Sequence, residues 1–345
     1  MSPLGDDELH QALSKLIEAG LLYRDGAPPD VSYGFKQTLI RDAAYQSPLK
    51  NSRRRFHAEI AKALETRFPD TAESEPELLA HHYTEADLPK QAVRYWGKAG
   101  VRALATYGHE EALGHFQQGL PAKEGRPMDA ETAALEFALG RAQAATLERH
   151  EMGKAVDSLR RAFDYYADVG DAARAIGVAE YPLPQLYKAG TGAAQLIARA
   201  LTLVPPDSRE AGRLLSRYGL VIGIEEGDYK GAQDAFGRAL DIAGREDDAV
   251  LEMETLVGVT SVDFAHLRFL EAVDQSPRAI ELALRAGDIE AELSARHAAA
   301  SSLREMGDLD GMRLHAAALL VPSKPFSHPR RPPRARWGSP GPVWR

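Results

Sequence analysis

Small and large apolar residues recur along this chain at the spacing of one helix face. The motif is Ala, three residues, a larger residue, two residues and Ala. Its copies are Ala155-Leu159-Ala162, Ala193-Ile197-Ala200, Ala232-Phe236-Ala239 and Ala272-Ser276-Ala279, with a degenerate copy at Met312-Ala316-Leu319. Successive copies start 38, 39, 40 and 40 residues apart. A fixed period of this size predicts stacked supersecondary units rather than one closed core.

Two further copies of the motif lie nearer the N-terminus, at Ala92-Trp96-Ala99 and Ala112-Phe116-Gly119. We expect the motif residues to pack helix against helix, because small residues let two helices approach and the larger residue fills the groove. They have a structural role in this interpretation, and we assign no catalytic, cofactor-binding or metal-binding residue. The set is Ala92, Trp96, Ala99, Ala112, Phe116, Ala155, Leu159, Ala162, Ala193, Ile197, Ala200, Ala232, Phe236, Ala239, Ala272 and Ala279.

One repeat can be followed in full between residues 211 and 243. A first helix has one apolar face, formed by Ala211, Leu214, Leu215, Tyr218 and Ile222, and a second has another, formed by Tyr229, Ala232, Phe236, Ala239, Leu240 and Ala243. Gly-Asp pairs recur as turns at Gly170-Asp171, Gly227-Asp228, Gly287-Asp288 and Gly307-Asp308. Glycine tolerates the left-handed backbone that ends a helix, and aspartate caps the next one.

The first 70 residues have a different pattern. Residues 6–19 predict an amphipathic helix that Gly20 ends, and apolar runs at 21–24 and 31–35 around a Gly/Pro/Asp loop predict a hairpin. Further helices are expected from near Lys36 and over 52–67. Helix, hairpin and helix together resemble the end of a winged-helix domain, and only five residues precede the first helix. We therefore expect a partial winged helix over 1–70, followed by helical repeats over 77–320.

The last 25 residues break the pattern. Residues 321–345 contain seven Pro, six Lys or Arg and no acidic residue, and proline prevents a continuing helix. Two interpretations stay open: a disordered Pro/Arg-rich tail, or sequence that is not native coding sequence, as a frameshift would produce. An earlier Pro-containing stretch, Tyr181-Pro182-Leu183-Pro184, predicts a break after the helix that follows Asp171. In a superhelix such a break can open the concave surface, which makes it a pointer to a binding site.

Composition narrows the class of protein. No apolar run approaches about 18 residues, and the N-terminus lacks the basic and apolar regions of a signal peptide, so we expect neither a membrane span nor secretion. The chain contains no cysteine, which excludes disulfides and thiolate metal sites. We expect a cytoplasmic protein. Residues 1–320 hold 36 basic and 50 acidic residues, a net charge of −14, which disfavours general nucleic-acid binding.

One segment is similar to the second half of the tetratricopeptide signature. It contains Gly227-Asp228-Tyr229, Ala232, Phe236 and Ala239-Leu240. The period near 40 exceeds the 34 residues of that repeat, and Gly219 lies one position away from the expected small residue. The longer period resembles the variant found in large bacterial signalling ATPases, including transcription activators of the maltose-regulator type. The resemblance implies an all-α superhelix of tetratricopeptide-like hairpins.

A second resemblance covers residues 33–120, through the segments 33–45, 54–65 and 76–83. These segments resemble the stretch between ATPase and repeats in adenylate/guanylate-cyclase-like proteins with an AAA/STAND-type signalling ATPase. Gln37 and Pro48 depart from the family, which usually has His and Leu there. The family's nucleotide-binding domain would lie upstream, and no G-x-x-x-x-G-K-S/T occurs in the chain. The chain is therefore interpreted as a fragment without its ATPase domain, and we expect no cofactor.

Other candidate residues have ordinary explanations. His81 and His82 point about 100° apart on a helix and do not converge on one metal, so we expect packing or capping. The run Arg53-Arg54-Arg55 has three interpretations: a DNA contact of the winged helix, a solvated helix face, or pairing with acidic groups of a neighbouring domain. The glycine-rich segment 190–194 lacks a lysine that could reach a phosphate, so we read it as a repeat turn.

Together these observations predict a non-catalytic module for protein–protein interaction or effector sensing in signal transduction. It would bind a protein, a peptide or a small inducer on its concave face and contact the ATPase domain of its parent protein. The alternative is a DNA-associated transcriptional regulator that uses the winged-helix remnant. A third hypothesis, an enzyme fragment that retains catalysis, finds no motif in the sequence.

Overall fold

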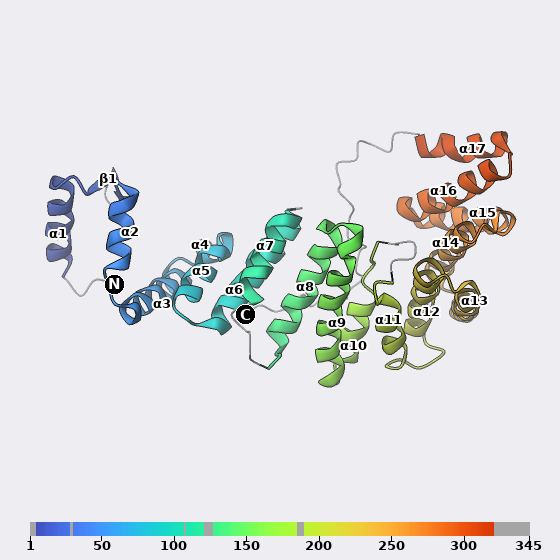
Figure 1. The fold of residues 1–345 in the computed structure, drawn as a ribbon, viewed down its shortest axis with the longest axis horizontal. Coiled ribbons are helices and arrows are strands. Elements are labelled where there is room, and N and C mark those ends of the chain that lie inside the picture. Colours follow the sequence, from blue (N-terminus) through green and yellow to red (C-terminus); the bar gives the residue numbers. More distant parts are fainter. Residues whose placement is uncertain (1–4, 28–29, 107, 121–126, 185–189, 321–345) are drawn as a thin grey trace. The chain divides into compact units, whose positions relative to one another are not determined.

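The computed structural model describes residues 5–27, 30–106, 108–120, 127–184 and 190–320 (Figure 1). The chain divides into two compact units, each described here by itself. Unit 1 comprises Met1–Gly100 and Gln117–Arg126, and unit 2 comprises Val101–Phe116 and Pro127–Arg345. The division into a winged-helix segment, repeats and tail stays a prediction, and its last part, 321–345, lies outside the described residues.

Unit 1 begins with a helix and a β-hairpin. Its elements are α1 (Asp6–Glu18), β1 (Leu22–Ala27), β2 (Asp30–Phe35), α2 (Thr38–Gln46), α3 (Lys50–Arg67), α4 (Pro69–Ser74), α5 (Pro76–Glu85) and most of α6 (Pro89–Ala105). The strands are antiparallel, with Leu22 opposite Phe35. Gly20 adopts a φ of +71°, which ends α1 as the sequence predicted. The predicted helix, hairpin and following helices are confirmed.

The core of unit 1 lies between α3, α5 and α6. It contains Ala61, Ala72, Leu79, Ala80, Tyr83, Ala92 and Tyr95. In contrast, α2 buries no residue; its Leu39 is 80% exposed, and Leu49, between α2 and α3, is 81% exposed. Apolar burial is the main favourable term in folding, so unit 1 is stabilised chiefly by α3, α5 and α6.

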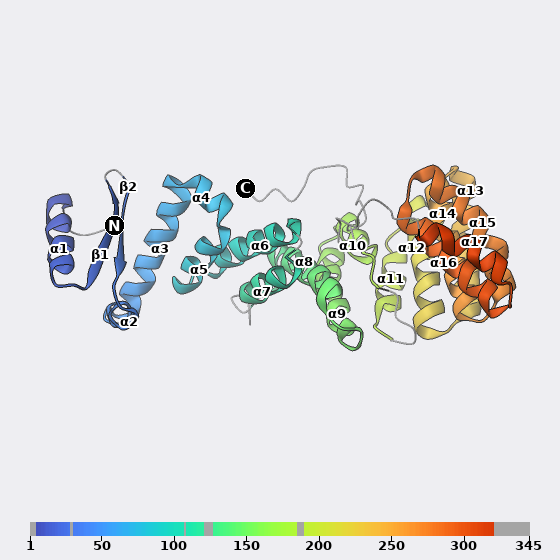
Figure 2. The same cartoon turned by 90° about the horizontal axis from the view of Figure 1, so that it is seen from above.

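Unit 2 is a series of helical hairpins (Figure 2). Its elements are α7 (His109–Gly119, which crosses into unit 1), α8 (Ala130–Thr146), η2 (Arg149–Glu151), α9 (Met152–Asp168), α10 (Ala172–Ala179), α11 (Ala193–Leu201), α12 (Arg209–Val221), a π-helical turn η3 (Ile222–Glu226), α13 (Tyr229–Glu246), α14 (Ala249–Ala265), α15 (Phe269–Ala286), α16 (Ile289–Glu305) and α17 (Leu309–Leu320). We call α8, α10, α12, α14 and α16 the first helices, and α9, α11, α13, α15 and α17 the second helices.

Each first helix packs on its neighbours. Within hairpins, α8 packs on α9, α12 on α13, α14 on α15 and α16 on α17; between hairpins, α12 packs on α14 and α14 on α16. One core cluster runs from Ala133 to Val262, and Phe163 and Phe236 are its largest fully buried side chains. Burying such a side chain contributes about 1.5–3 kcal/mol. The predicted all-α class, tetratricopeptide-like hairpins behind a small hairpin-containing segment, is confirmed.

Two first helices are irregular. The helix α10 ends at Ala179, and Tyr181-Pro182-Leu183-Pro184 follows outside any helix, which confirms the break predicted from the prolines. The end of α12 widens into the π-helical turn η3, which the sequence did not predict. π turns are rare inside helices and are often found at functional sites. The irregular backbone of α10 and α12 therefore makes this region a candidate binding site.

Candidate functional site

The motif residues lie in the contacts between helices. Nearly all are at most 3% exposed: Ala92, Ala99, Ala112, Phe116, Ala155, Leu159, Ala162, Ala193, Ile197, Ala200, Ala232, Phe236, Ala239, Ala272 and Ala279. Trp96 is half-buried, and its Nε1 donates to the hydroxyl of Thr84 at 3.0 Å. Ser276, the polar member of a motif, is fully buried, and its hydroxyl donates to the carbonyl of Ala272. Such burial is what a packing role requires.

Glycines on the first helices complete these contacts. A Cβ at Gly219 in α12 would lie 2.8 Å from the Phe236 ring and 3.0 Å from the Ala232 carbonyl oxygen. A Cβ at Gly140 in α8 would lie 2.8 Å from Leu159. The larger motif residue of the second helix therefore packs directly on the backbone of the first helix. The sequence motif found one side of this contact and missed Gly140 on the other.

The Gly-Asp turns hold the hairpins in the predicted way. Gly170, Gly227, Gly287 and Gly307 all have φ between +66° and +83°. The following aspartates each accept a hydrogen bond from the backbone N–H three residues later, at 2.9–3.1 Å. Each cap satisfies a donor that the first turn of a helix leaves unpaired. This prediction is confirmed at all four turns.

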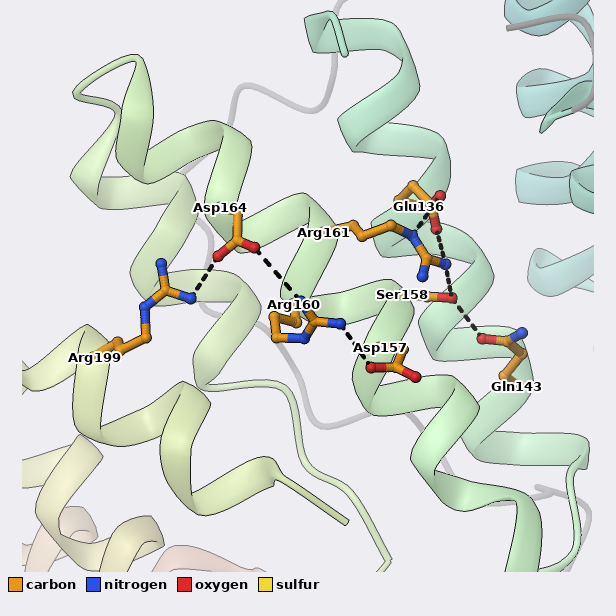
Figure 3. A network of polar contacts seen from close by, with 8 residues as sticks. All are labelled: Glu136, Gln143, Asp157, Ser158, Arg160, Arg161, Asp164 and Arg199. Carbon is orange, nitrogen blue, oxygen red and sulfur yellow. Dashed lines mark hydrogen bonds and ion pairs between the residues drawn. The ribbon is translucent and has the colours of Figure 1, made fainter. Parts of the chain in front are cut away.

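A polar network joins α8 to α9 (Figure 3). Glu136, with only 7% of its side chain exposed, accepts two hydrogen bonds from Arg161, at 2.8 and 2.9 Å. Arg161 also donates to the hydroxyl of Ser158, which donates to Gln143. A buried carboxylate must be paired to stay charged, and here the pairing is bidentate. The network therefore fixes how α8 packs on α9.

Exposed ion pairs continue on the side of the second helices. In Figure 3, Arg160 reaches Asp157 and Asp164, and Asp164 also pairs with Arg199 of α11. These side chains are 36–56% exposed. Exposed ion pairs contribute about 0–1 kcal/mol each, so this part of the network adds little stability.

Half-exposed or exposed charged and aromatic side chains gather on the first helices and at the break after α10. We define the first-helix face by six residues. They are Phe137 and Arg141 of α8, Tyr181 just after α10, Arg213 and Arg217 of α12, and Glu254 of α14. The spacing of four residues within α8 and within α12 places each pair on one side of its helix. These side chains are therefore free to meet across successive first helices.

Tyr181 is the centre of the contacts on the first-helix face. The guanidinium of Arg141 lies 5.7 Å from the ring centroids of both Phe137 and Tyr181, and the two rings meet edge to face at 6.1 Å. Arg217 donates from Nη2 to the Tyr181 carbonyl at 2.9 Å. The neighbouring Glu180 pairs with Arg213 at 2.8 Å. The break after α10 is therefore tied to both α8 and α12.

A small cavity lies beside Tyr181, with a volume of about 10 Å³. Its apolar wall includes Leu159, Leu183 and Ile197, and its polar atoms come from Arg217 and Glu225. The buried Glu225 accepts hydrogen bonds from the backbone N–H and the hydroxyl of Thr191, at 3.1 and 2.7 Å. Such a volume has room for about one water molecule.

The donors of Arg217 are incompletely used. Its Nε is buried and has no hydrogen-bond partner, although the guanidinium has five N–H donors in total. Burial lowers the pKa of Arg217, and nearby Glu254 opposes that shift. Burial raises the pKa of Glu254, and Arg217 opposes that shift in turn. A buried donor without a partner is costly.

Unit 1 has its own polar cluster, on α2, α3 and α5. The Nδ1 atoms of His57 and His82 are 2.8 Å apart, and the Tyr45 hydroxyl lies 3.1 Å from both His57 Nε2 and Glu85 Oε2. Burial and the neighbouring His57 lower the pKa of His82 to about 4. His81 and His82 have ring centroids 5.7 Å apart. His81 and His82 stand out in the sequence as adjacent histidines, but nothing in the sequence marks His57 as the partner of His82.

A partly buried carboxylate links α3 to α5 and α6. Glu65 accepts hydrogen bonds from the hydroxyls of Tyr83 and Tyr95, at 2.6 and 2.7 Å, and the two rings stack 5.5 Å apart. Burial acts to raise the pKa of Glu65, but the two hydrogen bonds outweigh it and the pKa is lowered. These contacts hold the core of unit 1 together.

The arginine run has partners within the chain. Arg54 pairs with Asp87 at 2.9 Å, Arg55 lies 3.7 Å from Glu59, and Arg53 lies over the Tyr45 ring. The Gly190–Ala194 segment leads into α11, where Gly192 is in the left-handed conformation at its start. Within the described ranges, no three His, Cys, Asp or Glu side chains are arranged to hold a metal ion. No described helix is both long and apolar enough to cross a membrane.

Comparison with known protein families finds no match to this chain. An uncharacterized protein of Rhizobium meliloti (strain 1021) is 28% identical over 116 residues, which is 34% of this chain and 11% of that protein. Among solved structures, the chain is similar to a Signal Transduction ATPase with Numerous Domains (STAND) protein with a tetratricopeptide repeat sensor, from Pyrococcus horikoshii. That similarity has a TM-score of 0.45 and 14% identity, and covers 92% of this chain and 52% of the other.

This chain thus spans about a tenth of the length of the curated relative and about half of the STAND protein. Both likenesses are too weak to transfer a function.

Proposed function

We propose that this chain is a non-catalytic helical-repeat module that binds a partner on its first-helix face. The observation that carries the proposal is the group of half-exposed arginine and aromatic side chains around Tyr181, where the regular stacking of first helices is interrupted. Arginine and tyrosine are the residue types that contribute most at binding interfaces. The second helices present mainly charged side chains that already form ion pairs within the chain, and so they offer fewer groups for binding a partner.

The partner in this proposal is a protein, a peptide or a small effector. The resemblance of residues 33–120 to the stretch between ATPase and repeats in signalling ATPases supports a parent protein in the cytoplasm that also carries a nucleotide-binding domain. In that setting, ligand binding on the repeats would restrain or release the ATPase. The repeats require no nucleotide or metal for this role.

The proposal is tested by selecting peptides from a random display library on the purified chain and mapping binding by hydrogen exchange. We expect new protection in α8, α12 and α14. The variant Glu254→Lys should change the affinity of selected peptides, and the matched charge change Asp234→Lys, at an exposed position of α13, should not. Duplex DNA serves as a second ligand, and steeply salt-dependent DNA binding would favour the regulator alternative. Protection confined to the second helices would contradict the proposal.

A further inference from the structure

We propose that Tyr45, His57 and His82 form a latch that holds α2 against α3 and α5, and that releases α2 when both histidines are protonated. Their side chains form one continuous line of hydrogen bonds, and each comes from a different helix. The latch lies in unit 1, so it does not depend on the proposed binding at the first-helix face.

Tyr45 is the residue that joins α2 to the core of unit 1. The helix itself buries no residue. The Tyr45 hydroxyl lies 3.1 Å from Nε2 of His57 and donates to Oε2 of Glu85, also at 3.1 Å. Arg53 of α3 contacts the same residue, because its guanidinium lies 5.4 Å from the ring centroid and its Nη1 donates to the Tyr45 carbonyl at 3.4 Å. Since α2 gains so little from apolar burial, these contacts decide whether the helix stays docked.

The direction of each hydrogen bond in the latch follows from the protons available. The single hydroxyl proton of Tyr45 goes to Glu85, so the Tyr45 oxygen accepts from the N–H at Nε2 of His57. A neutral histidine carries one ring proton, which leaves Nδ1 of His57 as an acceptor. This atom faces Nδ1 of His82 at 2.8 Å, so His82 donates there. The neutral latch therefore pairs every facing atom without a charge on either ring.

The latch can take up one proton without breaking, but not two. If His57 becomes charged, both its nitrogens donate, and His82 accepts at Nδ1 once its own proton has moved to Nε2. If both rings are charged, two N–H groups face each other across 2.8 Å, and two positive charges lie on rings with centroids 5.0 Å apart. Like charges at this distance repel, and neither facing N–H has an acceptor. The two rings must then separate.

The surroundings of the two histidines favour their neutral forms. Burial lowers the pKa of His57, and the neighbouring His81 and Arg53 lower it further, while Glu85 opposes them. Burial, His57 and His81 lower the pKa of His82 to about 4, and Glu85 again opposes the shift. The latch therefore stabilises the docked α2 above pH 6.5 and loses this effect as the pH falls toward 4.

Hydrogen exchange of the full chain, measured by mass spectrometry from neutral pH down to about pH 4, tests the latch. Each rate is divided by the rate of an unstructured peptide at the same pH, so that the acid dependence of exchange itself cancels. We expect the protection of α2 to fall toward pH 4 while α3, α5 and α6 stay protected. The 15N NMR signals of the imidazole nitrogens should show two protonation steps, with the loss of α2 protection following the second.

Two variants separate the hydrogen bonds of the latch from its charge. Tyr45→Phe removes the hydroxyl and should lower the protection of α2 about two- to tenfold at neutral pH. The control Tyr23→Phe, at a tyrosine of β1 with similar exposure (49% against 45%), should leave α2 unchanged. His82→Asn keeps an amide that donates to or accepts from Nδ1 of His57 but cannot be protonated, so α2 should stay protected in acid. The control His297→Asn, at an exposed histidine of α16, should follow the wild type.

Three results would overturn the proposal. Unchanged α2 protection in Tyr45→Phe would show that other contacts dock the helix. The same loss of α2 protection in the wild type and in His82→Asn would show that the second proton is not the trigger. Loss of protection in α3, α5 and α6 together with α2 would show acid unfolding of unit 1 as a whole instead of release of one helix. Each of these results leaves peptide binding at the first-helix face to its own display experiment.

Discussion

The contact between Gly219 and Phe236 allows a sharp test of how the hairpins pack. In the variant Gly219→Ala, the new Cβ would lie 2.8 and 2.9 Å from two ring carbons of Phe236 and 3.0 Å from the Ala232 carbonyl oxygen. The ring is 1% exposed and cannot swing into solvent, and the carbonyl belongs to the backbone of α13. One of the two helices must therefore shift.

Two opposing effects set the size of the change. Overpacking a core by a methyl group costs about 1–3 kcal/mol. Replacing glycine by alanine inside a helix contributes about 1 kcal/mol in the other direction. We therefore expect Gly219→Ala to lower the free energy of unfolding by about 0–2 kcal/mol in total.

The matched variant Gly237→Ala separates the two effects. Gly237 lies in α13, one residue after Phe236, and a Cβ there meets no atom within 4 Å. This variant should raise the free energy of unfolding by up to about 1 kcal/mol. The difference between the two variants then measures the steric cost alone, about 1–3 kcal/mol.

The assay is urea unfolding followed by far-ultraviolet circular dichroism, with hydrogen exchange of α12 and α13 as the local measurement. A repeat chain need not unfold in one step, so the exchange data decide where stability is lost. Gly219→Ala should cost less in a Phe236→Leu background than in the wild type, because the smaller side chain leaves room for the new Cβ. If Gly219→Ala is as stabilising as Gly237→Ala, the close packing described for α12 and α13 is wrong.

Three further predictions concern polar groups. Asp228→Ala removes the cap of α13 and should cost about 1 kcal/mol in urea unfolding, and no loss would contradict the capping role. Arg161→Met leaves the Glu136 carboxylate unpaired and should cost about 1–3 kcal/mol in the same assay. Arg160→Met loses only exposed ion pairs and should cost less than about 1 kcal/mol. Equal losses would refute the distinction between the buried and the exposed pairs. Burial lowers the pKa of His82 to about 4 from an ordinary 6.5, so the neutral ring stabilises the fold above pH 6.5 and this stability is lost as the pH falls toward 4. The thermal midpoint should therefore fall more steeply with acid in the wild type than in His82→Gln, and parallel curves would show that His82 does not contribute.

Much of the fold could be predicted because its determinants are local in the sequence. The motif period located the second helices, and the Gly-Asp pairs located the N-terminal caps of α10, α13, α16 and α17. The prolines after Tyr181 located the break after α10. Each of these signals depends on residues within one or two helical turns of each other. The π-helical turn η3 had no such signal, because the residues of Ile222–Glu226 also fit an ordinary helix.

The candidate site was predicted only as a place and not as a set of residues. The Pro-containing break pointed to Tyr181, but Arg217 is 36 residues away along the chain, and Arg141 is 40 residues away in the other direction. Nothing in the pattern of α12 distinguishes Arg217 from Arg213, which has a carboxylate partner. The same distance in sequence explains why His57 was missed as the partner of His82.

The contacts between hairpins also bear on how the chain folds as it is made. Described side-chain hydrogen bonds between hairpins join residues about one repeat apart, such as 34 residues for Thr191 and Glu225 and 39 for Arg209 and Asp248. Contacts of such short range favour fast folding. A ribosome adds about 5–20 residues per second, so one repeat emerges every few seconds. Each hairpin of unit 2 can therefore dock on the previous one before the next hairpin has been synthesised.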